Sequence, residues 1–169
     1  YEPMLVIQAQ AQLLKDADKL AASKPYRFDI VDVQRQMMTN LGQLVHKKAA
    51  EAFVAKDKAA FTLHSRRFLE LLSDMDELLY TRSEYSFDKW LTEARSWGET
   101  KEEKDLMERD ATSLVTIWGA DGDPRIFDYS WREWAGLING YYLPRWQKFY
   151  TMLQGHLDAG TDYQEEGLP

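Results

Sequence analysis

The sequence contains no cysteine, which excludes both disulfide bonds and thiolate metal sites. It also has no uninterrupted apolar run of about twenty residues, the length that a membrane-spanning helix requires. The first residues, Tyr1-Glu2-Pro3, do not begin a basic segment followed by an apolar one. We therefore expect neither a transmembrane helix nor a signal peptide. Because the first residue is not methionine, we expect the chain to be part of a longer polypeptide.

Basic residues are too few to favour an anionic partner. The chain has 21 lysines and arginines against 28 aspartates and glutamates, which gives a formal net charge of −7. Nucleic-acid binding draws its affinity from basic side chains that neutralise phosphates, and anionic membranes attract proteins in the same way. The composition therefore predicts no nucleic-acid partner and no membrane partner.

Patterns that bind metals or phosphates are missing as well. The three histidines, His46, His64 and His156, are far apart and show no HExxH-like spacing. No glycine-rich phosphate loop is present. Gly136 and Gly140 have GxxxG spacing, which in a soluble helix favours close approach of a neighbouring helix. We expect no metal and no cofactor.

Apolar residues recur every three or four positions along most of the chain, a spacing that is typical of amphipathic helices. Asp57 and Ser86 are placed to cap two of these helices, and Thr100 with Glu103 has the spacing of a capping box. Gly119 is placed to end a helix in a left-handed conformation. The predicted helices span residues 4–22, 28–55, 57–80, 86–97 and 100–119, followed by a turn-rich loop and one long helix.

That last helix is expected to be capped by Asp128, or by Ser130 with Glu133 as a capping box. Pro144 should kink or interrupt it. No strand-like alternation is present, so we predict an all-α fold, a bundle of about six helices with a long kinked C-terminal helix. We expect residues 1–160 to form one helical domain and residues 161–169 to be a frayed tail.

Aromatic residues concentrate in residues 116–150, which hold four of the six tryptophans. A tryptophan stripe at helical spacing more often packs a core than binds a sugar. Trp118, however, lies at a helix end beside a glycine-containing loop, where binding residues tend to occur. A sugar could pack its C–H face on this indole, with Asp128, Tyr129 or Arg145 as partners for its hydroxyls.

Four acids accompany this stretch: Asp121, Asp123, Asp128 and Glu133. Hydrolysis of a glycosidic bond typically needs two carboxylic residues, one on each side of the sugar. Each of the four also has an ordinary structural role, in a turn, before a proline, as an N-cap or in a capping box. We interpret all four as structural.

A set of short motifs at fixed spacings occupies residues 116–146. Weaker matches lie upstream in Phe28-Asp29-Ile30-Val31-Asp32, in Arg35-Gln36 and from Leu78 to Trp90 and Leu91. The motifs are Thr116-Ile117-Trp118-Gly119, Asp128-Tyr129-Ser130, Trp134-Ala135-Gly136-Leu137, Tyr141-Tyr142 and Pro144-Arg145-Trp146. This set resembles the C-terminal all-helical domain of the α-N-acetylglucosaminidases, glycoside hydrolase family 89. Thr112 departs from the pattern, since the family usually has an arginine there.

The resemblance implies a parent enzyme that is secreted, periplasmic or lysosomal. Such an enzyme removes terminal α-linked N-acetylglucosamine from glycans with retention of configuration and without a cofactor. In that family the catalytic glutamates belong to a separate (β/α) barrel domain, so we expect no catalytic residue in this chain and no activity of the chain alone. Its expected partners are that barrel domain and a glycan with terminal N-acetylglucosamine.

The aromatic-rich stretch is accordingly divided into two groups. For the rim of the parent's substrate pocket we predict Trp118, Gly119, Asp128, Tyr129 and Arg145. For the core or the interface with the barrel we predict Trp131, Trp134, Tyr141, Tyr142 and Trp146. The alternative hypothesis is a stand-alone helical module that binds a protein or a glycan without catalysis.

Overall fold

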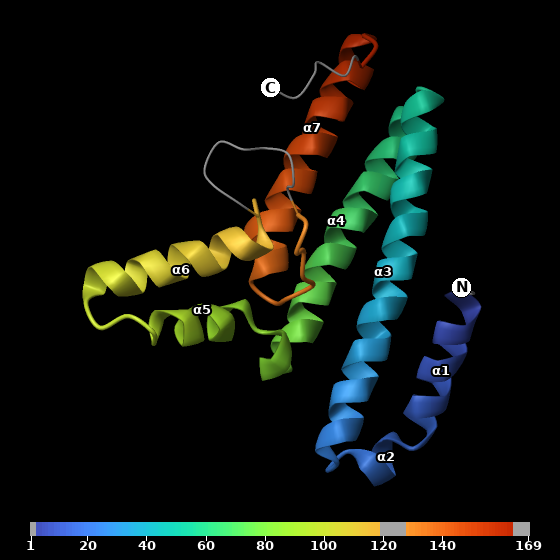
Figure 1. Ribbon diagram of the computed structural model, residues 1–169. Coiled ribbons are helices and arrows are strands. Elements are labelled where there is room, and N and C mark those ends of the chain that lie inside the picture. The colour runs from blue at the N-terminus through green and yellow to red at the C-terminus, as the bar shows by residue number, and fades with distance from the viewer. Residues whose placement is uncertain (1–2, 119–127, 164–169) are drawn as a thin grey trace.

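A computed structural model describes residues 3–118 and 128–163, and these residues form a helical structure (Figure 1). The only β-type pairing among them is an isolated bridge between Ser86 and Ala135. The all-α prediction is confirmed. The elements are α1 (Pro3–Lys15), α2 (Ala17–Leu20), α3 (Lys24–Val54), α4 (Lys58–Tyr80), a 3₁₀ turn (Ser83–Tyr85), α5 (Phe87–Arg95), α6 (Lys101–Val115), a π-helical turn (Ile138–Tyr142) and α7 (Leu143–Ala159). None of the described helices is long and apolar enough to cross a bilayer.

The centre of the molecule is a long hairpin formed by α3 and α4 (Figure 1). α7 packs on α4, and α1 packs on α3. One buried cluster joins α3, α4 and α7, and a second joins α3, α4 and the π-helical turn. The first contains Ala49, Ala52, Phe61, Phe68, Tyr150, Leu153 and Leu157, and the second contains Val31, Met38, Met75, Leu79, Ala135 and Ile138.

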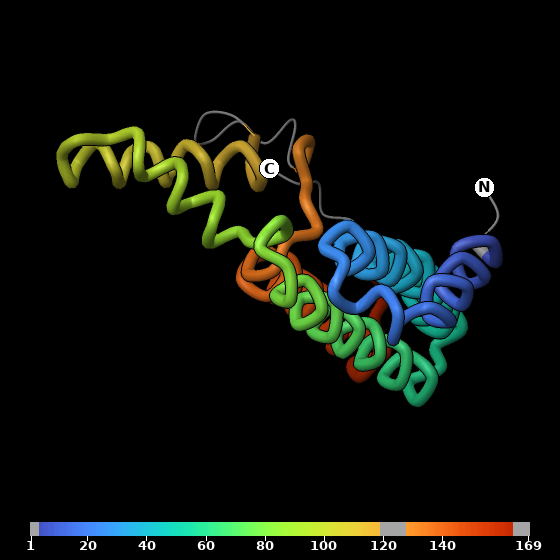
Figure 2. Tube along the Cα trace, turned by 90° about the horizontal axis from the view of Figure 1, so that it is seen from below, coloured from blue at the N-terminus to red at the C-terminus, as the bar shows by residue number. Residues whose placement is uncertain are grey.

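The α5–α6 hairpin projects from this bundle as an arm (Figures 1 and 2). Its two helices contact each other, with the indole Nε1 of Trp90 donating to the backbone oxygen of Ala111 at 3.1 Å. Arg95 of α5 pairs with Asp105 and Glu108 of α6. α5 leads away from the bundle and α6 returns to it, so the start of the aromatic-rich stretch at the end of α6 lies beside α7 (Figure 1).

The predicted helix starts at Asp57, Ser86 and Thr100 are confirmed. Asp57 accepts from the backbone amide of Ala60 at 2.9 Å, and Ser86 accepts from that of Lys89 at 3.2 Å. At the third start both bonds of the predicted capping box are present. Each cap satisfies amide groups that the first helical turn leaves without partners.

Two predicted boundaries near the N-terminus are wrong. The first helix is interrupted at Asp16, so α1 and α2 replace the single predicted helix over residues 4–22. The next helix begins at Lys24 rather than near Phe28, with Ser23 as its N-cap. Pro25 therefore lies in the first helical turn, where its missing N–H costs nothing.

The predicted start of the C-terminal helix is also wrong. Residues 131–134 are not helical, and Gly136 has a positive φ of 85°, which its missing β-carbon permits. Asp128 and Ser130 therefore cap no helix, and the predicted helical GxxxG contact is not formed. The irregularity expected at Pro144 takes the form of the π-helical turn just before it, in which the amide of Leu143 donates to the oxygen of Ile138.

Asp76 fixes the position of this turn from the facing helix α4. Its side chain is almost fully buried and accepts from the backbone amides of Gly136 and Asn139 at 2.8 and 3.1 Å. It also accepts from the Asn139 side-chain amide at 2.9 Å. A buried carboxylate is tolerated only when such donors replace its water.

We expect Asp76→Ala to lower the free energy of unfolding by about 3 kcal/mol or more, because it leaves buried donors without partners. Urea unfolding followed by circular dichroism measures this change. Asp74→Ala, two residues away on the exposed side of α4, is the matched control and should change stability by less than about 0.5 kcal/mol. Equal effects of the two substitutions would contradict the role of Asp76.

His46 of α3 lies at the edge of the first cluster. Its ring is in contact with Phe68, Trp146 and Tyr150, and its Nδ1 is 2.8 Å from the Tyr150 hydroxyl. Partial burial lowers the pKa of His46 below its ordinary value of 6.5. Protonation of this imidazole is therefore easier in the unfolded chain than in the folded one.

The stability that neutral His46 contributes to the folded state is fully present above pH 6.5. It is lost as the pH falls through 6.5 toward the lower pKa of His46 in the folded state. We expect His46→Gln, which keeps a hydrogen-bonding group but cannot be protonated, to reduce the loss of stability between pH 7 and pH 5. Melting temperatures of both proteins across this range test the prediction. Identical pH profiles would show that His46 makes no such contribution.

Candidate functional site

The described residues place four of the five predicted rim residues in one cluster. Trp118 follows α6, Asp128 and Tyr129 follow the undescribed residues 119–127, and Arg145 lies in the first turn of α7. Gly119, the fifth predicted rim residue, lies outside the described residues, as do Asp121 and Asp123. We call Trp118, Asp128, Tyr129, Arg145 and the adjoining Tyr141 the rim cluster.

Backbone hydrogen bonds fix the positions of Trp118 and Asp128 beside the end of α6. The amide of Trp118 donates to the oxygen of Ser113 at 2.7 Å, and the amide of Asp128 donates to the oxygen of Thr116 at 2.8 Å. Both Trp118 and Asp128 have left-handed backbone conformations, with φ of 44° and 60°. Such conformations are uncommon outside glycine and are often found at functional sites.

The aromatic side of the cluster is formed by Trp118 and Tyr129. Their ring centroids are 5.1 Å apart, within the range of favourable aromatic pairs. Tyr129 is 70% exposed although it is a large aromatic residue. Trp118 is partly buried, so Tyr129 supplies most of the aromatic surface that the pair presents to solvent.

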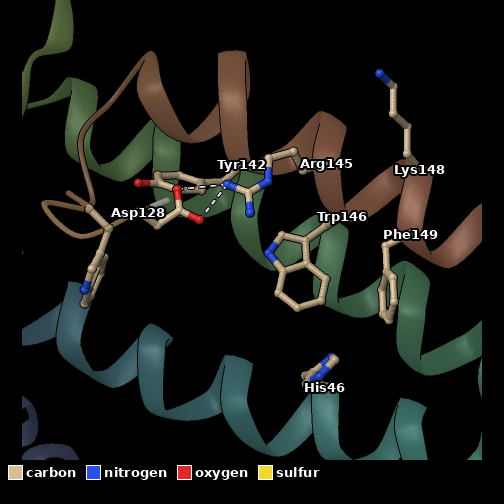
Figure 3. Close-up of a pocket in the computed structure, with 8 residues that line it drawn as sticks. His46, Asp128, Tyr142, Arg145, Trp146, Lys148 and Phe149 are labelled. Carbon is tan, nitrogen blue, oxygen red and sulfur yellow. Dashed lines mark hydrogen bonds and ion pairs between the residues drawn. The ribbon is translucent and has the colours of Figure 1, made fainter. Parts of the chain in front are cut away.

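The polar side of the cluster is formed by Asp128 and Arg145. Nη1 of Arg145 donates to both carboxylate oxygens of Asp128, at 2.9 and 2.7 Å (Figure 3). The guanidinium also lies 4.9 Å from the centroid of the Tyr141 ring. Burial alone would lower the pKa of Arg145, but its hydrogen bonds to Asp128 raise it, so the guanidinium stays charged and held in place.

Arg145 and Asp128 also line an open pocket of about 650 Å³ between α3 and α7 (Figure 3). His46, Trp146 and Tyr142 form much of its wall, and Lys148 points away from Arg145 in Figure 3. Burial raises the pKa of Tyr142 to about 12, so its phenol stays protonated at neutral pH. The pocket therefore combines aromatic surfaces with hydrogen-bonding groups at one edge.

The five residues predicted for the core or a domain interface lie in different environments. Trp131 is 52% exposed beside the pocket, whereas Trp146 is partly buried against the first cluster. Trp134 is partly buried and pairs with Trp90 of the arm at 5.7 Å. Tyr141 and Tyr142 are partly buried and in contact, with ring centroids 5.1 Å apart.

The two described acids in this region are both engaged in ion pairs. Asp128 pairs with Arg145, while Glu133 pairs with Arg35 of α3 and accepts from the Thr39 hydroxyl at 2.5 Å. Neither carboxylate is free to act as a general acid or nucleophile across a sugar. Glu133 is thus a tether rather than the predicted capping-box residue, and it holds residues 131–134 against α3.

Several residues of this region could not be recognised from the sequence. His46 and Arg35 reach it from α3, about a hundred positions away. No local pattern marks His46, and Arg35 was quoted only in a weaker upstream match that assigned it no role. One signal in the sequence could have identified Asp76: it is a charged residue on the apolar stripe of α4, between Met75 and Leu79. Within the described part of the chain, no group of three histidine, aspartate or glutamate side chains is placed to hold a metal ion.

Comparison with known proteins places this arrangement in a family. Residues 1–168 match the model of the alpha-N-acetylglucosaminidase (NAGLU) C-terminal domain. Human alpha-N-acetylglucosaminidase is 33% identical over 162 residues, which cover 95% of this chain and 21% of the human protein.

Two structures of a family 89 glycoside hydrolase from Clostridium perfringens have the same fold, each with a TM-score of 0.90 and 31% identity over 98% of this chain. One is a complex with 2-acetamido-1,2-dideoxynojirmycin, and the other is a variant with two glutamate-to-glutamine substitutions in complex with its substrate GlcNAc-α-1,4-galactose. The chain spans about a fifth of the length of these relatives. The chain belongs to the glycoside hydrolase family 89 α-N-acetylglucosaminidases, as a C-terminal helical domain of that family.

Proposed function

We propose that this domain packs on the catalytic domain of a parent α-N-acetylglucosaminidase and forms part of the wall of its substrate pocket. The parent would hydrolyse terminal α-linked N-acetylglucosamine from glycans. The observation that carries the proposal is the rim cluster, in which an aromatic pair with an exposed Tyr129 adjoins a guanidinium held by a carboxylate. An apolar ring face and fixed hydrogen-bond donors are the two features that sugar recognition needs.

The ion pairs of Asp128 and Glu133 bear on which domain of the parent would supply the catalytic carboxylates. Asp128 and Glu133 are neutralised by arginines, so the domain would bind and orient the glycan while the catalytic carboxylates are supplied by the preceding domain. The Clostridium perfringens relative was captured with GlcNAc-α-1,4-galactose, which supports the same substrate class for the parent of this chain.

Trp118→Ala in the complete parent enzyme should lower kcat/KM for an aryl α-N-acetylglucosaminide by about ten-fold or more, because it removes the larger ring of the aromatic pair. Trp97→Ala is the matched control. Trp97 is 82% exposed at the other end of the arm, so its removal should leave kcat/KM unchanged. A normal kcat/KM for the Trp118 variant would contradict the proposed pocket wall.

Asp128→Asn tests the polar side separately. Asparagine tolerates the left-handed conformation at this position, so the fold should be retained while the charge that holds Arg145 is lost. We expect kcat/KM of the parent to fall by about three- to ten-fold with little change in melting temperature. Asp162→Asn, which removes the carboxylate of an exposed pair with Lys56, is the control and should change neither quantity.

A further inference from the structure

Trp131 is 52% exposed, although the segment that carries it is held on both sides. Its amide donates to the oxygen of Asp128 at 3.0 Å, and its own oxygen accepts from Nη1 of Arg132 at 2.9 Å. Two positions later, the ion pair between Glu133 and Arg35 anchors the segment on α3. An indole that stays exposed on a fixed backbone is preorganised for contact with a ligand.

The open pocket of about 650 Å³ between α3 and α7 connects Trp131 with the rim cluster. Asp128 and Arg145 belong to the rim cluster and also line this pocket, and Trp131 lines it with them. Among the described residues, Trp118 and Tyr129 lie outside the lining. The ion pair of Asp128 and Arg145 therefore adjoins both the aromatic pair and the pocket. A ligand that contacts the aromatic pair can extend past the ion pair into the pocket.

The lining of the pocket combines aromatic faces with hydrogen-bonding groups. Figure 3 shows Trp146 and Phe149 along one side of α7, with His46 facing them from α3. A guanidinium has five N–H groups, and Arg145 binds Asp128 through Nη1 alone, so the ion pair leaves donors for a ligand. A pyranose ring matches this lining, because it has apolar C–H faces and hydroxyl groups around its edge.

We propose that this pocket binds the second sugar of the glycan, to which the terminal N-acetylglucosamine is linked, and that Trp131 is the aromatic platform for that sugar. The inference rests on the proposed function, because the second sugar reaches the pocket only if the terminal one lies beside the rim cluster. Trp131 is then a specificity-determining residue. It favours substrates that have a sugar in this position over those with a small alkyl group.

Trp131 also has a structural contact that the test must separate from sugar binding. It lines a smaller apolar pocket of about 320 Å³, together with Met38 of α3 and Met75 of α4. Removal of the indole should therefore cost some stability. A loss of folded enzyme lowers activity toward every substrate by the same factor, whereas a lost sugar contact affects only substrates that have the second sugar.

Kinetics of the complete parent enzyme with two substrates test the proposal. One substrate is the disaccharide GlcNAc-α-1,4-galactose, and the other is methyl α-N-acetylglucosaminide, which has no second sugar. Trp131→Ala should lower kcat/KM for the disaccharide at least about five-fold more than kcat/KM for the methyl glycoside. Trp131→Phe, which keeps an aromatic face, should change the ratio of the two values by less than about two-fold. Trp97→Ala, at an 82% exposed position on the arm, is the matched control and should leave the ratio unchanged.

An unchanged ratio for Trp131→Ala would overturn the proposal, because the indole would then have only a structural role. Hexyl α-N-acetylglucosaminide separates sugar recognition from apolar contact. If Trp131→Ala lowered kcat/KM for this compound as much as for the disaccharide, the pocket would bind apolar groups, and the proposal would be wrong. The proposed function is tested by the absolute kcat/KM of the Trp118 variant, whereas this inference is tested by a ratio between substrates. Failure of one is therefore distinguishable from failure of the other.

Discussion

The carboxylate of Asp76 connects the central hairpin to the region that contains the candidate site. It lies on α4 and accepts both backbone amides that open the C-terminal helical region, at Gly136 and Asn139. Because these amides precede or begin the helix, they have no acceptor of their own within it. Asp76 therefore acts as an N-cap supplied from another helix. Glu133 lies in the segment just before these amides, and its ion pair with Arg35 holds that segment against α3.

Contacts made by nearby residues could be predicted from the sequence, whereas the contacts of Asp76 and Glu133 with distant residues could not. Helix caps made by local residues, such as Asp57 and the Thr100–Glu103 box, depend on spacings of three residues and were predicted correctly. The start of the last helix depends on Asp76, sixty residues earlier in the chain, so the local alternatives Asp128 and Ser130 were favoured wrongly. Glu133 satisfied a local pattern, but its actual partners lie on α3.

The structure brings four of the predicted rim residues together, and their place at the rim of a substrate pocket stays a prediction. Trp118, Asp128, Tyr129 and Arg145 belong to a motif with fixed spacings, and the described residues bring them together. Sequence spacing alone did not indicate that Asp128 would pair with Arg145, because that contact depends on the left-handed backbone at Asp128 and on the π-helical turn before Arg145. The pocket beside the cluster depends further on His46 from α3, which no local signal identified.

The chemistry of the rim cluster bears on the kind of partner that it could take. The cluster lies at the junction of α6 and α7, beside the α3–α4 hairpin (Figures 1 and 2). A purely apolar surface gains stability from burial against any well-fitting apolar partner, which favours permanent attachment. An aromatic pair beside a fixed guanidinium gains more from a partly polar ligand that can satisfy its donors. The cluster therefore suits a partner that binds and leaves, as the proposed substrate must.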